Sequence, residues 1–178
     1  MKGAPLKRKK SGRTNYGKRL SMLVSRKPRA VIRKSLKGMQ IQIVDYAPDG
    51  DHIITGTHTR ELKAYGVTHM QSNIATAYLT GLLAGKKAQA KGVKEVLVDL
   101  GLQKAHPGGK LYAAVKGLID SGLTVPCDES VLPSQERLEG KHIEDYAKTV
   151  TLTGYKKAGL DGASITSTFK TAKEKILG

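Results

Sequence analysis

The segment Met39–Asp45 (MQIQIVD) decides the fold, because apolar and polar residues alternate along it with period two. That alternation is typical of a strand with one buried face and one exposed face. The turn signal PDGD follows at residues 48–51, and a second strand-like run occupies residues 52–59. Upstream, residues 29–34 predict another strand, joined through a turn at Lys37-Gly38. Three strands linked by tight turns predict an antiparallel meander.

Beyond the third strand the apolar period changes to that of a helix. Residues 74–91 predict a helix ended by Gly92, and residues 111–121 predict another, stopped by Gly122. Short apolar runs within 93–100 and at 123–126 predict strands. Helix–strand–helix–strand order implies parallel pairing with right-handed crossovers. The expected fold class is α/β: one mixed sheet, an N-terminal antiparallel three-stranded meander followed by αβαβ, with helices on its faces.

The length of 178 residues suits one domain with tails. We expect a basic arm over residues 1–27, a globular α/β domain over 28–149 and a C-terminal tail over 150–178. Within the domain, residues 134–149 predict a further helix. The tail is rich in Thr, Gly and Lys and can carry a helix from about Ser164 onward.

Charge is segregated along the chain. The first 44 residues hold 14 Lys and Arg and no acid, whereas the remainder holds 17 Lys and Arg against 15 Asp and Glu. Such segregation predicts a polyanion-binding arm on a nearly neutral domain. We expect self-repulsion to keep much of the arm unfolded until a polyanion arrives. A short helical turn over residues 16–24 is expected to dock Leu20, Leu23 and Val24 on the domain.

The polyanion is expected to be nucleic acid rather than a membrane surface. The arm lacks the large apolar face of a membrane-binding helix, and no apolar run approaches the roughly 20 residues of a spanning helix. The N-terminus has no apolar stretch typical of a signal peptide, and the single Cys127 suits a reducing compartment. An intracellular, cytoplasmic protein is therefore expected.

Specificity is expected from residues beyond the arm. Arg29 and Arg33 should share one face of the first strand, with Lys34 on the other, giving a rigid basic patch. Tyr16 can stack on an unpaired base or pack on the domain. No helix-turn-helix, zinc finger or RNA-recognition motif is present, which favours RNA recognised by its shape, or an architectural role.

A catalytic alternative starts from Asp45, Glu61 and Asp99, which lie at or after predicted strands. Carboxylates at neighbouring strand ends can bind Mg²⁺ in a nuclease-like site, but each can equally be a turn residue or a partner of Lys. The five His lack metal-ligand spacing, and the glycine loop 106–110 can hold a phosphate or be a plain loop. We expect no catalytic residue, metal, cofactor or small-molecule substrate.

Several ordered motifs carry a resemblance to a known family. They include TNYxKRL at residues 14–20, KPRxVxRKS at 27–35, QIVDY at 42–46, TREL at 59–62 and AYLxGLLAGKKA at 77–88, and they continue to GxHIxxY at 140–146. Together they span residues 12–147. In these motifs the chain resembles the large-subunit ribosomal protein L-eighteen family, in its archaeal and eukaryal-type branch. The loop 68–74 lacks the family's glycines, residues 103–107 diverge, and the tail from 150 matches nothing recognised.

The resemblance implies a ribonuclease H-like sheet without catalysis. It also implies binding of 5S rRNA in the central protuberance of the cytoplasmic large subunit, with contacts to the large rRNA and neighbouring ribosomal proteins. General nucleic-acid packaging and a metal-dependent nuclease remain the alternatives. The residues expected to contact RNA are Lys7, Arg8, Lys9, Lys10, Arg13, Arg26 and Lys27 from the charge of the arm, and Thr14, Asn15, Tyr16, Lys18, Arg19, Arg29, Arg33, Lys34, Ser35, Arg60 and Asn73 from the family motifs.

Overall fold

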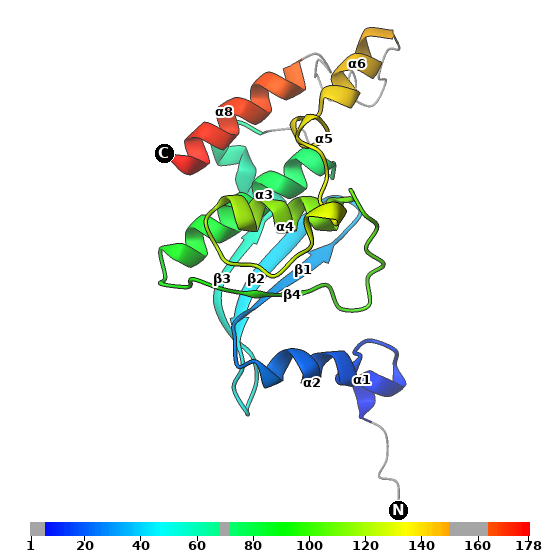
Figure 1. The fold of residues 1–178 in the computed structure, drawn as a ribbon, viewed down its shortest axis with the longest axis vertical. Helices are drawn as coiled ribbons and strands as arrows, with labels where there is room; N and C mark the ends of the chain where they lie inside the picture. The colour runs from blue at the N-terminus through cyan, green and yellow to red at the C-terminus, as the bar shows by residue number, and fades with distance from the viewer. Residues whose placement is uncertain (1–5, 68–71, 150–163) are drawn as a thin grey trace, which may run out of the picture.

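The computed structural model describes residues 6–67, 72–149 and 164–178 (Figure 1). Its strands are β1 (Arg29–Lys34), β2 (Met39–Asp45), β3 (His52–His58) and β4 (Leu97–Asp99). Its helices are α1 (Lys7–Lys10), α2 (Tyr16–Val24), α3 (Ile74–Gln89), α4 (Lys110–Asp120), α5 (Gln135–Glu139), α6 (Lys141–Thr149) and α8 (Ile165–Leu177), with 3₁₀ turns η1 (Thr59–Tyr65) and η2 (Glu129–Val131).

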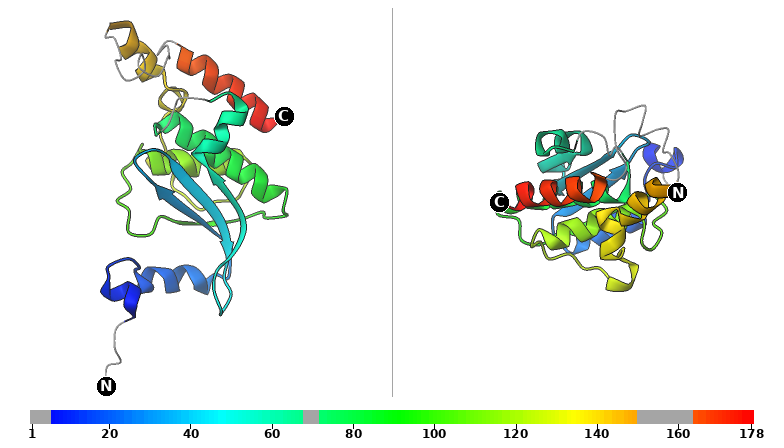
Figure 2. Two further views of the ribbon diagram at one scale, coloured as in Figure 1. Left: turned by 180° about the vertical axis from the view of Figure 1, so that it is seen from behind. Right: turned by 90° about the horizontal axis from the view of Figure 1, so that it is seen from above.

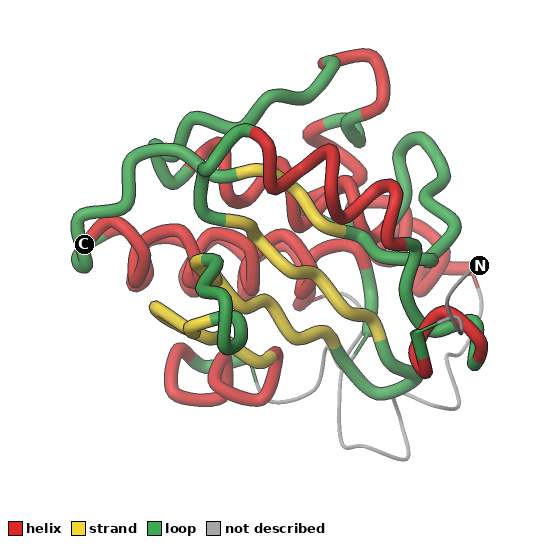
Figure 3. Tube along the Cα trace, turned by 90° about the horizontal axis from the view of Figure 1, so that it is seen from below, coloured by secondary structure: helices red, strands yellow, loops and turns green. Residues whose placement is uncertain are grey.

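The four strands form one mixed sheet in the order β3-β2-β1-β4. β2 pairs antiparallel with both β1 and β3, and β4 pairs parallel with β1. Figure 3 views the molecule from the end where α2 joins β1 and shows these strands side by side. The α/β class and the mixed sheet are thereby confirmed, while the ribonuclease H-like description stays a prediction.

The period-two alternation of β2 separates a buried face from an exposed one. Ile41 and Ile43 are fully buried and pair in register with the buried Ile32 and Ala30 of β1, whereas Gln40 on the same strand is exposed. α3 and α4 cover this apolar face together, as the view from behind shows (Figure 2). Helices were expected on the faces of the sheet, and α3 and α4 both lie on this one.

Glycines let α3 and α4 approach closely. A Cβ added at Gly81 would lie 2.1 Å from the carbonyl oxygen of Ala114, and one added at Gly117 would lie 2.2 Å from that of Tyr78. Such distances leave no room for a side chain on either helix. The close crossing holds α4 against α3 and so fixes the start of α4 beside the start of α3.

Two predicted elements differ from the structure. The strand at 123–126 is reduced to one bridge between Glu95 and Thr124, because Pro126 has no N–H with which to extend a ladder. The helix predicted over 134–149 is broken into α5 and α6 at Gly140, whose φ of 84° lies in the left-handed region.

The last described helix, α8, belongs to the core. It begins one residue after Ser164, as predicted, and it buries Ile165, Phe169, Ala172 and Ile176. The Phe169 ring centroid lies 5.5 Å from that of Tyr78 on α3. The rest of the predicted tail, residues 150–163, lies outside the described residues. None of the described helices is long and apolar enough to cross a membrane.

Candidate nucleic-acid interface

The basic arm folds as two short helices over part of its length. The Asn15 side chain caps α2 by accepting a hydrogen bond from the Lys18 amide at 3.1 Å, and Arg8 Nε donates to Thr14 Oγ1 at 3.0 Å. The four basic residues of α1, Lys7–Lys10, are all exposed. The helical turn expected over residues 16–24 is confirmed as α2, whereas the helix at residues 7–10 was not expected. Both helices present cationic side chains, and the expectation that much of the arm is unfolded before a polyanion arrives stays a prediction.

Ion pairs join this arm to the domain. Arg19 Nη2 lies 2.8 Å from Asp51 Oδ1 in the turn between β2 and β3. Lys27 Nζ lies 2.6 Å from Glu95 Oε2, just before β4. Because both pairs are partly exposed, each contributes modestly, at most about 1 kcal/mol. Together they tether α2 and the segment that follows it to the domain.

Apolar docking of the arm, by contrast, does not occur as expected. Leu20 and Val24 remain 65% and 75% exposed, and only Leu23 is half-buried. The prediction that these three residues pack on the domain is wrong for Leu20 and Val24. The reason is that α2 faces the domain with its charged residue Arg19, which reaches the Asp51 carboxylate.

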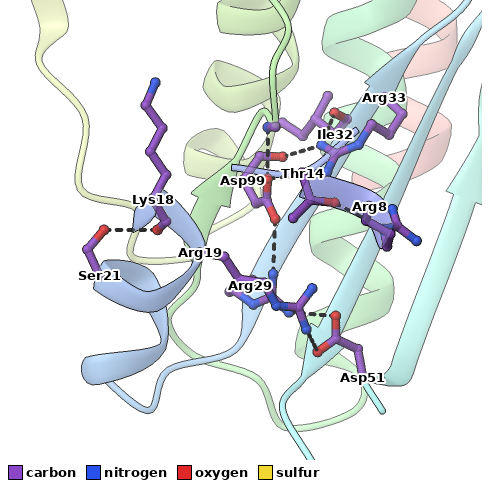
Figure 4. A network of polar contacts seen from close by, with 11 residues as sticks. Arg8, Thr14, Lys18, Arg19, Ser21, Arg29, Ile32, Arg33, Asp51 and Asp99 are labelled. Atoms are coloured by element: carbon purple, nitrogen blue, oxygen red, sulfur yellow. Dashed lines mark hydrogen bonds and ion pairs between the residues drawn. The ribbon is translucent and has the colours of Figure 1, made fainter. Parts of the chain in front are cut away.

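Arg29 lies inside the protein, not on an exposed patch. Its side chain is 2% exposed, with Nη1 3.0 Å from Asp99 Oδ2 and Nη2 2.7 Å from Asp51 Oδ2 (Figure 4). The contact with Asp51 is an ion pair without hydrogen-bond geometry, and Nε has no partner among the described residues. Two carboxylates therefore offset the burial of this charge. The expectation that Arg29 and Arg33 form an exposed pair is therefore wrong, because Arg29 is buried and pairs with Asp51 and Asp99.

Arg33 is both fixed and accessible. Nη1 donates to the carbonyl oxygens of Asp99 at 2.7 Å and Ile32 at 2.8 Å, and Nη2 lies 3.2 Å from Asp99 Oδ1. The side chain is nevertheless 44% exposed. Asp99 thus holds both arginines of β1, and it also accepts the Gly101 amide at 2.8 Å. Its role in the structure is to position cations.

A groove of about 850 Å³ opens between the arm and the β4 side of the domain. The domain wall includes Asp99, Tyr112 and the segment 100–103. Of the residues expected to contact RNA, the groove brings together Arg8, Arg13, Thr14, Asn15, Lys18, Arg19 and Arg33.

The other expected residues lie elsewhere. Lys34 and Asn73 line a second hollow, and the Ser35 hydroxyl donates to the Gly38 carbonyl in the turn between β1 and β2. Arg60 is exposed on η1, after β3, at the opposite edge of the sheet from β4. Tyr16 is half-buried, and Lys7, Lys9, Lys10, Arg26 and Lys27 are exposed outside the groove lining.

Two organising residues escaped the sequence analysis. Gln103 accepts the Lys34 amide at 2.9 Å and donates to the Ile32 carbonyl at 2.7 Å, which ties the loop after β4 to the end of β1. Asp51 joins the arm to Arg29. Only the acidic turn next to a basic strand indicated Asp51. No sequence pattern indicated Gln103, because its partners on β1 lie about 70 residues away.

The three carboxylates of the nuclease hypothesis do not converge. Asp45 pairs in register with His52 at one end of β2, whereas Glu61 follows His58, which pairs with Gln40 at the other end. Gln40 and Asp45 are five residue steps apart along the strand, which is about 17 Å. Among the described residues, no group of three or more His, Cys, Asp or Glu side chains could hold a metal ion.

Two of the three carboxylates, Asp99 and Glu61, also contact other groups. Asp99 binds Arg29 and Arg33, and Glu61 accepts the His58 amide at 2.9 Å and pairs with Lys87. Partial burial works to raise the pKa of Glu61, but Lys87 and the His58 amide outweigh it, so the pKa lies below its usual value. These contacts favour the alternative in which the acids are structural partners.

Known proteins resemble this chain over nearly its full length. A family model described as "Ribosomal large subunit proteins 60S L5, and 50S L18" matches residues 4–96. Large ribosomal subunit protein uL18 of Thermofilum pendens is 41% identical, over 97% of this chain and 93% of its own length. The uL18 proteins of Methanococcoides burtonii (40% identical, 96% and 91%) and Halobacterium salinarum (41% identical, 97% and 94%) are similarly close. The chain belongs to this family of large-subunit ribosomal proteins.

Proposed function

We propose that the chain is a structural constituent of the large ribosomal subunit that binds 5S rRNA and anchors it in the central protuberance, while contacting the large rRNA and neighbouring ribosomal proteins. It acts in the ribosome without catalysis, metal or cofactor. The observation that carries the proposal is the groove in which Arg8, Arg13, Lys18 and Arg33 converge from the arm and from β1.

The groove suits an RNA backbone. Each Lys or Arg that neutralises a phosphate releases counterions, so affinity falls with salt by a slope of roughly 0.7 to 0.9 per contact. The guanidinium of Arg33 is always charged and remains 44% exposed, so its N–H groups that are not bound to Asp99 and Ile32 can donate to a phosphate. Because Asp99 and two carbonyls already fix Arg33, little further side-chain entropy is lost on binding.

The domain fixes the position of the arm, which a flexible basic tail would lack. Asp51 connects Arg19 on α2 with the buried Arg29 on β1. The arm is thereby held at one side of the groove before RNA arrives, which lowers the ordering cost of binding. Recognition then depends on the spacing of phosphates in a folded RNA, as shape recognition requires.

The test is a comparison of affinities for the purified whole chain. Gel-shift titrations would use 5S rRNA, a large-rRNA fragment and duplex DNA of equal length. We expect 5S rRNA to bind tightest, by about 10³-fold over duplex DNA, the lower end of specific over non-specific binding. Equal affinity for 5S rRNA and duplex DNA would instead favour general nucleic-acid packaging.

A further inference from the structure

A second hollow, of about 390 Å³, lies where α3 and α4 begin. Lys34, Lys104, Lys110 and Arg137 line it, and no Asp or Glu does. None of these four cations has an ion pair within the described part of the chain. The hollow is therefore a cation-lined recess without compensating charge.

Backbone donors add to the positive potential. Gly109 is the N-cap of α4, and no side chain caps the first turn of this eleven-residue helix. Gly109, Lys110 and Leu111 line the hollow. The uncapped amides of a helix N-terminus favour an anion.

Two side chains at the start of α3 and α4 are pre-positioned. Lys110 Nζ donates to Ser72 O at 3.0 Å and lies 3.2 Å from Ser72 Oγ, so it spans the gap between the two helices. Asn73 Oδ1 accepts the Thr76 amide at 2.8 Å, which fixes its side-chain amide. Asn73 Nδ2 is then a buried donor with no partner among the described residues. A buried donor left unpaired is costly, so an acceptor placed within its reach would be stabilising.

The hollow is distinct from the groove. Arg33 lines the groove, and the next residue, Lys34, lines the hollow. Successive side chains of a strand point to opposite faces, so the two sites lie on opposite sides of the end of β1. Gln103 and Lys104 repeat the same division in the loop after β4.

We propose that this hollow is a second RNA site, which binds a backbone phosphate through Lys104, Arg137, Lys110 and the first amides of α4. The inference rests on the proposed function, because the ligand is taken to be the same class of folded RNA. Its consequence is that the protein holds RNA backbone on both sides of the β1 end. Such a clamp fixes the orientation of an RNA, which one groove alone does not do.

The experiment has two parts, a phosphate titration and an RNA titration. In the first, inorganic phosphate is titrated into ¹⁵N-labelled whole chain, and the amide signals of Gly109 and Lys110 are followed. We expect saturable shifts in the wild type and in the control Lys63→Gln/Lys170→Gln. In Lys104→Gln/Arg137→Gln they should be lost. All four substituted residues are exposed, so each double variant should fold normally.

The RNA titration measures the affinity for 5S rRNA as a function of salt concentration for the same proteins. The Lys104→Gln/Arg137→Gln variant should bind roughly tenfold more weakly, with a salt slope lower by about 1 to 2. If the wild type binds 5S rRNA and this variant matches it in affinity and slope, the second site is refuted while the proposed function stands. If the wild type ignores 5S rRNA but keeps its phosphate shifts, the proposed function and the RNA assignment both fall, leaving only a free-phosphate site.

Discussion

The helices α2, near the N-terminus, and α8, near the C-terminus, are attached to the domain in opposite ways. α8 buries Ile165, Phe169, Ala172 and Ile176, and so completes the core above α3. α2 buries no residue fully, leaves Leu20 and Val24 exposed, and is tethered through Arg19 and Lys27. Both helices carry apolar and polar residues, but only α8 packs its apolar side into the core.

The difference separates stability from binding. Burial of apolar area dominates the folding free energy and is not weakened by charge screening, whereas partly exposed ion pairs are weak and screened. α8 is therefore expected to unfold only with the domain. α2 is held firmly enough to be oriented, yet its cations remain available to an anion that competes with Asp51 for Arg19.

The largest expected effect belongs to α8. Phe169→Ala removes a ring that is 1% exposed and packs on Tyr78, so the free energy of unfolding should fall by about 3 to 5 kcal/mol. Denaturant unfolding measures this change. The matched control is Leu20→Ala on α2, which should change stability by less than about 0.5 kcal/mol. Equal losses for the two variants would contradict the contrast between the helices.

The next effect concerns the two arginines of β1. Arg29→Gln leaves the carboxylates of Asp51 and Asp99 without their buried partner and should cost about 3 kcal/mol of stability. Arg33→Gln, at a half-exposed side chain, should cost less than about 1 kcal/mol but weaken 5S rRNA binding. Thermal unfolding with a parallel gel-shift separates the two roles. A stable Arg29→Gln protein with impaired RNA binding would place Arg29 at the RNA instead.

The smallest effect is the response of α2 to salt. Raising ionic strength from about 0.1 M to about 1 M shortens the screening length from about 10 Å to about 3 Å. Hydrogen exchange of the α2 amides should then quicken, while exchange in α8 stays unchanged. The substitution Arg19→Gln should reproduce the faster α2 exchange at low salt. Exchange in α2 that ignores both changes would show that the ion pairs do not hold the arm.

Features that depend on residues close together in the sequence could be predicted, and features that depend on residues far apart in the sequence could not. The period of Met39–Asp45 and the helical rows of 74–91 are local, and both elements formed where expected. The break at Gly140 was missed because a helix period continues through it in the sequence. In the structure, Gly140 adopts a left-handed conformation and separates α5 from α6.

The site was harder to predict than the fold because its partners are distant in sequence. Asp99 lies 70 residues after Arg29, and no periodicity shows that the two meet. The charge of the arm pointed to Arg8 and Arg13, which line the groove, and the family motifs pointed to Lys18, which also lines it. It could not distinguish Arg29 from Arg33, because alternation places both on one face and only the turn carrying Asp51 decides which is covered.

The most direct test of the account is the salt dependence of 5S rRNA binding when the groove loses its arm cations. The triple variant Arg8→Gln/Arg13→Gln/Lys18→Gln should lower the salt slope by about 2 to 3, at about 0.7 to 0.9 per contact. The control Lys63→Gln/Lys170→Gln/Lys175→Gln removes the same charge at exposed residues outside the groove and should leave the slope nearly unchanged. Equal slopes for the two triple variants would contradict the claim that the groove between arm and domain holds the RNA.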